Sequence, residues 1–218
     1  MPSTVICCVW VNGHVPYTPD YVTKLYGMVH RWMDRPFKFV CLTDHPWLFS
    51  GPIRTIPIPP PGPLKGWWRK LEVFNPAHTK LSGRILYLDL DTLIVASLGP
   101  ILDYPAPFAL VPHAGTFEGM DGLRVVKRYN SSVMVWTAGT QASLYRDWTP
   151  AVADRLWGDQ DWIGEHHPAA ALMPASWFPR LSQVSTGPPF GAAKVILSKK
   201  PKNVEAAKRW AWFERAWV

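Results

Sequence analysis

Hydrophobic and polar residues alternate along this chain with two periods, one typical of buried strands and one typical of amphipathic helices. Short apolar runs rich in β-branched and aromatic residues predict strands at 4–11, 37–43, 53–58, 84–95, 108–112, 132–136 and 194–197. Helical spacing predicts a helix that begins at Pro19, and further helices at 67–74, 142–148 and 160–165. This alternation predicts an α/β fold, a mixed, mostly parallel sheet flanked by helices.

Two carboxylates, Asp89 and Asp91, interrupt the otherwise apolar run at 84–95. On a strand, side chains two residues apart point to the same face, so the two carboxylates repel each other unless a positive charge lies between them. Hard oxygen ligands at this spacing suit Mn²⁺ or Mg²⁺, which would keep coordination positions for the phosphate oxygens of a nucleotide. The alternative is a pair of solvated aspartates on an edge strand. The apolar flanks indicate a buried sheet and therefore favour the cation.

Length and composition bound the class of protein. The chain has 218 residues, of which 48% are hydrophobic, enough to bury the core of one domain. Its three cysteines, Cys7, Cys8 and Cys41, have no C-x-x-C spacing, so we expect neither a disulfide framework nor a zinc site. No apolar stretch is long enough to span a bilayer, and the first residues do not resemble a signal peptide. These features predict a cytoplasmic protein.

The C-terminal end combines basic and aromatic residues. The chain carries a formal net charge of +7 and 13 tryptophans, and many of its lysines and arginines follow residue 193. Asn203 resembles a helix cap, and Ala206, Trp210, Phe213 and Trp217 then form one apolar stripe. We therefore expect a main domain at 1–202 and a basic aromatic helix at 203–218. That helix either docks on the core or lies on an anionic membrane at its inner face, while no nucleic-acid-binding motif is present.

Further polar residues fall where ligands bind in a doubly wound sheet, at the carboxyl ends of strands. Thr43 and Asp44 end the second predicted strand, Asn130 and Ser131 open a later one, and Asp159 opens a predicted helix. For Asp44, a role in a turn is favoured over a role in ligand binding. For Asp159, a helix-capping role and a ligand-binding role are equally consistent with the sequence.

Four segments occur in an order that carries a resemblance. They are G-W-W-R-K-L-E-V-F at 66–74, L-Y-L-D-L-D at 86–91, Y-N-S-S-V-M-V-W at 129–136 and G-D-Q-D at 158–161. In this order, over about residues 4–202, the chain resembles bacterial nucleotide-sugar glycosyltransferases of the GT-A fold, most closely those akin to family 8.

The resemblance implies a role for each matching residue. It implies that Asp89 and Asp91 bind Mn²⁺ (or Mg²⁺) and, with Leu90 between them, the donor diphosphate. It also implies that Arg69 or Lys70 approaches the phosphates or the sugar. It further implies that Asn130 and Ser131 line the sugar pocket, that Asp159, Gln160 and Asp161 face the reacting centre, and that Trp10, Asn12, Thr43 and Asp44 hold the nucleoside.

One position departs from the family pattern. Ser198 stands where the family has a histidine that is the third protein ligand of the metal, and Lys199 and Lys200 would take over part of the charge neutralisation. The leading hypothesis is a retaining, metal-dependent enzyme that moves a hexose from a UDP-sugar to a polysaccharide or lipid-linked acceptor. The alternative is a catalytically degenerate protein that binds nucleotide sugars or carbohydrates. A nucleotidyltransferase is disfavoured, because residues 10–14 contain no glycine-rich phosphate loop.

Overall fold

A seven-stranded sheet forms the centre of the computed structural model, which describes residues 3–13, 16–58, 62–118, 124–184, 187, 191–198 and 201–218. The strands are β1 (Thr4–Trp10), β2 (Lys38–Thr43), β3 (Ile53–Pro57), β4 (Arg84–Leu88), β6 (Phe108–Glu118), β7 (Arg124–Thr137) and β8 (Ala171–Leu172). Their order is β3-β2-β1-β4-β7-β6-β8. The first four are mutually parallel, and β7 is antiparallel to both β4 and β6. The mixed, mostly parallel sheet predicted from the sequence is therefore confirmed. A second sheet pairs β5 (Leu93–Ile94) with β9 (Val195–Ile196).

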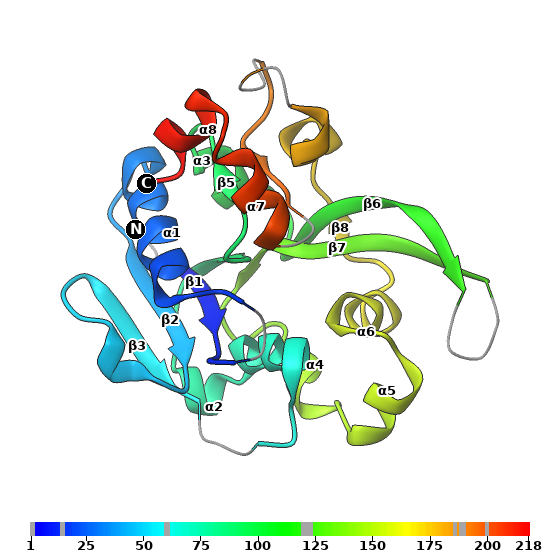
Figure 1. The fold of residues 1–218 in the computed structure, drawn as a ribbon. Helices are drawn as coiled ribbons and strands as arrows, with labels where there is room; N and C mark the ends of the chain where they lie inside the picture. Colours follow the sequence, from blue (N-terminus) through cyan, green and yellow to red (C-terminus); the bar gives the residue numbers. More distant parts are fainter. Residues whose placement is uncertain are drawn as a thin grey trace.

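Helices lie against both faces of the central sheet (Figure 1). The α-helices are α1 (Pro19–Trp32), α2 (Pro76–Thr79), α3 (Gly99–Leu102), α4 (Ser143–Arg146), α5 (Pro150–Arg155), α6 (Asp159–His166), α7 (Pro201–Ala207) and α8 (Ala211–Ala216). The 3₁₀ helices are η1 (Pro46–Leu48), η2 (Gly66–Phe74), η3 (Ala175–Trp177) and η4 (Leu181–Gln183). None of the helices described is long and apolar enough to cross a bilayer.

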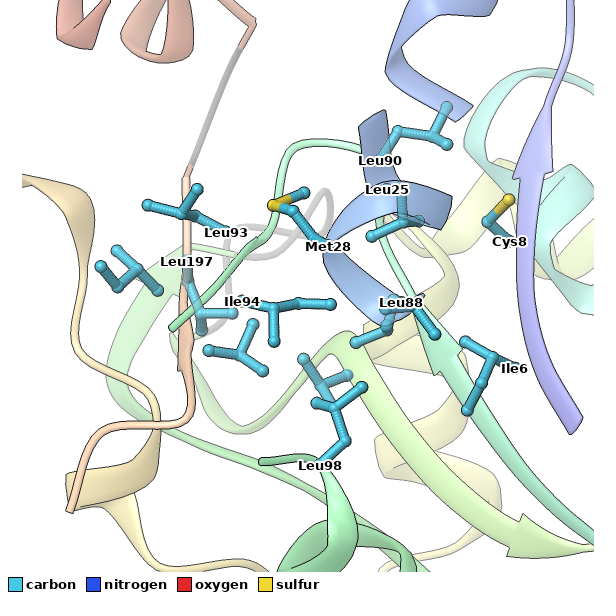
Figure 2. Packing of buried hydrophobic residues seen from close by; sticks show 14 of the residues in the cluster. Ile6, Cys8, Leu25, Met28, Leu88, Leu90, Leu93, Ile94, Leu98 and Leu197 are labelled. Carbon is cyan, nitrogen blue, oxygen red and sulfur yellow. The ribbon is translucent and has the colours of Figure 1, made fainter. Parts of the chain in front are cut away.

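The sheet separates two apolar layers because successive side chains of β1 point to opposite faces. Ile6 and Cys8 belong to one buried apolar cluster with Leu25 and Met28 of α1, as Figure 2 shows. Val5 and Cys7 belong to the opposite layer, which η2, α4 and α6 cover. A strand buried on both faces reads as a continuous apolar run, which is why β1 could be predicted from its composition.

The prediction of one continuous strand at 84–95 is wrong for residues 89–92. β4 ends at Leu88, a turn covers residues 89–92, and β5 starts at Leu93. The amide of Asp89 still donates to the carbonyl of Ser132 at 2.8 Å. The hydroxyl of Thr92 then donates to the carbonyl of Asp89 at 2.7 Å and closes the turn. The two carboxylates are therefore placed by a turn at the end of β4, and not by strand alternation.

The hairpin of β6 and β7 is longer than predicted. The apolar runs at 108–112 and 132–136 form its base, and strand pairing continues to Glu118 and Arg124. Figure 1 shows this hairpin extending beyond the other strands of the sheet. Its register shifts twice, after Leu110 and after Pro112. Such irregularities bend a strand and interrupt the alternation on which sequence prediction relies.

The C-terminal segment forms two short helices, α7 and α8, instead of the single helix expected at 203–218. The backbone of Trp210 is extended between them, so the expected stripe is not continuous on one helix. Figure 1 shows both helices beside α1. Phe213 and Trp217 are buried in the core, and the guanidinium of Arg31 donates to the carbonyl of Arg215 at 3.0 Å. This arrangement corresponds to docking of Phe213 and Trp217 on the core.

Candidate active site

A pocket of 290 Å³ opens at the carboxyl ends of β1 and β4. In parallel α/β sheets, this is the edge at which ligands bind. The lining residues come from the end of β1, the segment before α1, η2, the end of β4 and the turn after it: Val9, Trp10, Val11, Tyr17, Gly66, Trp67, Arg69, Lys70, Tyr87, Asp89 and Leu90.

The helix η2 brings Arg69 and Lys70 to this pocket because of its 3₁₀ geometry. With three residues per turn, side chains three positions apart lie on the same side. Trp68, Leu71 and Phe74 follow this spacing and are buried in the core. Trp67 and Lys70 follow it on the pocket side. One short helix thus anchors its apolar side and presents its basic side to the pocket.

Lys70 is the centre of a buried polar cluster. Its side chain is 11% exposed, and its ammonium lies 3.0 Å from Asp89 Oδ1 and 3.2 Å from Asp159 Oδ2. It also donates to Ser131 Oγ at 3.1 Å, and Ser131 Oγ donates to Asp159 Oδ2 at 2.5 Å. Because an ammonium has three N–H donors, each can be directed to one of these three acceptors. Lys70 therefore joins three segments that are distant in sequence, the turn after β4, β7 and the first turn of α6.

The surrounding charges keep Lys70 protonated. Burial by itself would lower its pKa, but Asp159 and Asp89 outweigh burial and raise the pKa well above its ordinary value. The hydroxyl of Tyr87 donates to Asp89 Oδ1 at 2.8 Å, and the Tyr87 ring lies 5.2 Å from the Lys70 ammonium. Burial, followed by the charge of Asp89, raises the pKa of Tyr87. Tyr87 therefore acts as a neutral donor that fixes the Asp89 carboxylate.

Asp91 is the more deeply buried of the two paired aspartates, with 6% of its surface exposed. Burial, followed by repulsion from Asp89, raises its pKa from 3.8 to about 7, although the nearby Tyr17 hydroxyl partly opposes this shift. A carboxyl group with such a pKa lies beside negative charge that the protein does not fully neutralise. Burial, followed by the charge of Asp91, also raises the pKa of Tyr17, so its hydroxyl stays protonated.

The residues present fit a hard divalent cation. Asp89 and Asp91 supply carboxylate oxygens, the ligands that Mn²⁺ and Mg²⁺ prefer, and a cation between them would relieve the repulsion that raises the pKa of Asp91. Within the described part of the chain, no group of three or more His, Cys, Asp or Glu side chains is arranged to hold a metal. A cation here would therefore take two protein carboxylates and complete its coordination with oxygens of water or of a ligand.

Among the residues expected to hold the nucleoside, some line the pocket and others shape the turn after β2. Trp10 lines the pocket, and the backbone amide of Asn12 donates to Asp44 Oδ1 at 3.1 Å, which ties the end of β1 to the end of β2. Thr43 is fully buried, and its hydroxyl accepts from the His45 amide at 3.1 Å. Thr43 therefore shapes the turn after β2, and its side chain is not available to a ligand.

Asn130, Gln160, Asp161 and Ser198 were expected at the site, but none of them lines the pocket. Asn130 lies inside β7, and its Oδ1 accepts from the Ser132 amide at 2.8 Å. This side chain therefore orders the irregular stretch of β7 opposite the register shift after Leu110. Gln160 and Asp161 are half-buried in the first turn of α6, directly after Asp159. Ser198 follows β9 and is half-buried. Lys199 and Lys200 lie outside the described residues.

Three pocket residues were missed by the sequence analysis. Tyr17 precedes the first turn of α1, where it reads as an ordinary loop aromatic, and it gave no signal. Tyr87 stands two positions before Asp89, a spacing that could have suggested a partner for the carboxylate. Trp67 belongs to the motif at 66–74 but was not selected, although it is 55% exposed, which is unusual for a residue this large.

No protein-family model and no curated protein sequence matches this chain. Several solved structures, however, match its fold. The galactosyltransferase LgtC, in complex with donor and acceptor sugar analogs, superimposes with a TM-score of 0.67 at 13% identity, over 97% of this chain and 93% of LgtC. The bifunctional glycosyltransferase WbbM in its apo form gives a TM-score of 0.60 at 12% identity, over 99% of this chain and 51% of WbbM.

A third match has the same kind of fold. The apo form of the glycosyltransferase GlyE from Streptococcus pneumoniae gives a TM-score of 0.56 at 11% identity, over 82% of this chain and 47% of GlyE. This chain thus spans nearly all of LgtC but about half of WbbM and of GlyE. The order and direction of its strands agree with the α/β, GT-A-like architecture expected from the sequence. We conclude that this chain has the GT-A-like fold of these glycosyltransferases.

Proposed function

We propose that this protein is a metal-dependent glycosyltransferase that moves a hexose from a UDP-sugar to a saccharide or lipid-linked acceptor. One observation carries the proposal. At the carboxyl edge of the sheet, Asp89 and the buried Lys70 line a pocket of 290 Å³, and the buried Asp91 lies in the same turn as Asp89. A carboxylate pair with excess negative charge suits a cation, and a cation beside basic side chains suits a diphosphate. The shared fold with solved glycosyltransferases favours a nucleotide sugar over other diphosphates.

Asp89 and Asp91 would hold Mn²⁺ or Mg²⁺ in this proposal. When bound, such a cation neutralises the charge that develops on a leaving diphosphate. Lys70 keeps Asp89 and Asp159 in fixed positions and stays charged in the absence of ligand. Arg69, on the pocket side of η2, supplies a further positive group for the phosphates.

The reacting sugar would lie between the diphosphate site and α6. Asp159 is held by both Lys70 and Ser131, so its carboxylate has a defined direction before the donor binds. Gln160 and Asp161 follow it on the same helical turn. We assign Gln160 or Asp161 to the face of the sugar from which the leaving group departs, where a polar side chain stabilises developing positive charge. A stabilising group on this face would favour retention of configuration at the reacting carbon of the sugar.

The acceptor would bind beside Trp67. This indole is 55% exposed, lines the pocket and packs against Gly158, where an added Cβ would lie 3.3 Å from the ring. Trp157, the residue before Gly158, is 54% exposed. Exposed aromatic rings next to a polar pocket present the flat apolar surface on which the C–H face of a sugar packs.

Replacing Trp67 with alanine should therefore weaken the use of acceptor more than the use of donor. We expect the acceptor KM to rise by about 10-fold or more, since stacking and area lost from one indole amount to about 1.5–3 kcal/mol. Hydrolysis of the donor in the absence of acceptor should change little. Steady-state kinetics with both substrates measures the two effects, and Trp47→Ala, which removes an indole that is 72% exposed and does not line the pocket, is the matched control. Equal effects on both steps would argue against an acceptor role.

Calorimetric titration with a panel of nucleotides and nucleotide sugars, with and without Mn²⁺, tests the function as a whole. We expect UDP or a UDP-sugar to bind in Mn²⁺ and to bind at least about 10-fold more weakly after chelation, because the carboxylate pair repels a diphosphate when no cation is present. Binding to no nucleotide under either condition would contradict the proposal. It would instead favour a carbohydrate-binding protein in which Ser198 marks the loss of a metal ligand.

A further inference from the structure

A second cavity, the distal groove, opens between the end of α1 and the starts of β2 and β3. Its volume is 710 Å³, compared with 290 Å³ for the pocket at the carboxyl edge. It is lined by Tyr26, His30, residues 33–39, Pro52 and Arg54. The start of β2 lies beside the start of β1, because the two strands are parallel. The active-site pocket lies at the other end of β1, about 13 to 16 Å further along the strand. The distal groove is therefore separate from the site described above.

Aromatic rings form the inner side of the distal groove. The ring of Tyr26 lies 5.5 Å from the ring of Phe39 and 6.4 Å from the ring of Phe37. Phe39 is buried and anchors this group in the core, whereas Tyr26 and Phe37 are half-buried and line the groove. Rings that are held in this way present a flat apolar surface, on which the C–H face of a sugar can pack.

The rim of the groove carries positive charge that the protein does not pair. Asp34, the acidic residue of the lining, accepts from Arg35 at 2.8 Å, and Arg35 also donates to Asp103, so these charges compensate each other. Lys38 and Arg54, by contrast, are exposed. Neither side chain forms an ion pair or a hydrogen bond with any residue that the structure describes. Two free cations beside an aromatic surface are complementary to an anion that also has an apolar face.

We propose that the distal groove is a second carbohydrate site, which binds a saccharide chain that carries carboxylate groups. A sugar ring packs on Tyr26 and Phe37, while Lys38 and Arg54 bind the carboxylates. Two cations are too few for the many phosphate contacts on which nucleic-acid affinity depends, so an acidic saccharide is favoured over a nucleic acid. The inference goes beyond the proposed function and does not depend on it, because the groove holds neither the cation nor the donor. In a glycosyltransferase, such a site would retain an acidic acceptor chain between rounds of transfer.

The test is calorimetric titration of the full-length protein with an oligogalacturonate, at low salt and without metal. The neutral probe is a galacto-oligosaccharide of the same length, which should bind at least about 5-fold more weakly than the acidic one. The double variant Lys38→Gln with Arg54→Gln should weaken binding of the oligogalacturonate by about 5- to 10-fold, because both exposed ion pairs are lost. Phe37→Leu, which keeps an apolar side chain but removes the flat ring, should weaken it by about 3- to 10-fold. Thermal unfolding of each variant confirms that the fold is kept.

The matched control is Lys80→Gln with Arg209→Gln, which removes the same charges from two exposed residues that do not line the groove. Parental affinity in this control, together with weaker binding in both groove variants, would support the second site. The proposal is overturned if the parent does not bind the oligogalacturonate, or if the control weakens binding as much as the groove variants do. It is equally overturned if a single-stranded oligonucleotide binds the groove and the oligogalacturonate does not. Binding of UDP in Mn²⁺ should be the same in all of these variants, so a failure of the groove and a failure of the proposed function would be seen in separate measurements.

Discussion

Replacing Lys70 with methionine is expected to lower the free energy of unfolding by about 3–5 kcal/mol at pH 8 and to remove transfer activity. Methionine keeps the aliphatic stem of lysine, so the change isolates the charge. In the parent, the ammonium lies within 3.2 Å of both Asp89 and Asp159, and its side chain is 11% exposed. Without it, two buried or partly buried carboxylates and the hydroxyl of Ser131 lose their shared partner. The cost comes from leaving these groups unpaired and does not measure the net worth of the ion pairs.

Denaturant unfolding of the parent and of Lys70→Met at pH 8 measures this effect. Lys24→Met is the control, since Lys24 pairs with the exposed Asp20 at 3.7 Å on the surface of α1. Such a pair contributes at most about 1 kcal/mol. A Lys70 variant as stable and as active as the parent at pH 8 would show that the cluster is not an organising element of the site.

The sequence was sufficient to predict, at least in part, every strand of the main sheet except β8, and the edge of the sheet at which the pocket opens. β1 and β2 are buried on both faces, so their apolar composition reports their surroundings directly. The sequence also predicted a short helix at 67–74. It did not predict the 3₁₀ geometry that turns Trp67 and Lys70 to the same side, because three and 3.6 residues per turn give similar patterns over nine residues.

Contacts between distant segments were beyond a reading of one sequence. The pairing of Tyr21 with Glu205 joins residues 184 positions apart, and nothing local to either residue indicates it. The same holds for Lys70, whose partners come from the turn after β4, from β7 and from α6. The break between α7 and α8 was missed because the apolar spacing around Trp210 suits a continuous helix, and packing against α1 overrode it.

Replacing Asp91 with asparagine is expected to change stability and ligand binding in opposite directions. Mn²⁺-dependent binding of UDP should weaken by more than about 100-fold, because a charged ligand of the cation becomes a neutral amide. In the absence of metal, however, the variant should unfold less readily than the parent at pH 8, by on the order of 2–4 kcal/mol. Calorimetric titration and denaturant unfolding measure the two effects, and Asp154→Asn on the exposed side of α5 is the control.

The sign of the stability change follows from the pKa of Asp91, which is about 7 in the folded protein and 3.8 in the ordinary reference state. The folded state therefore holds this proton more tightly than the unfolded state. The resulting stabilisation is complete below about pH 4 and is lost as the pH rises through about 7. Asparagine removes this loss, so parent and variant should differ at pH 8 and converge near pH 4. Saturating Mn²⁺ should stabilise the parent and not the variant. A variant that is less stable than the metal-free parent at pH 8, and that still binds UDP in Mn²⁺, would mean that Asp91 is an ordinary structural carboxylate. The predicted pattern would mean instead that the folded chain retains a destabilising charge because the cation requires it.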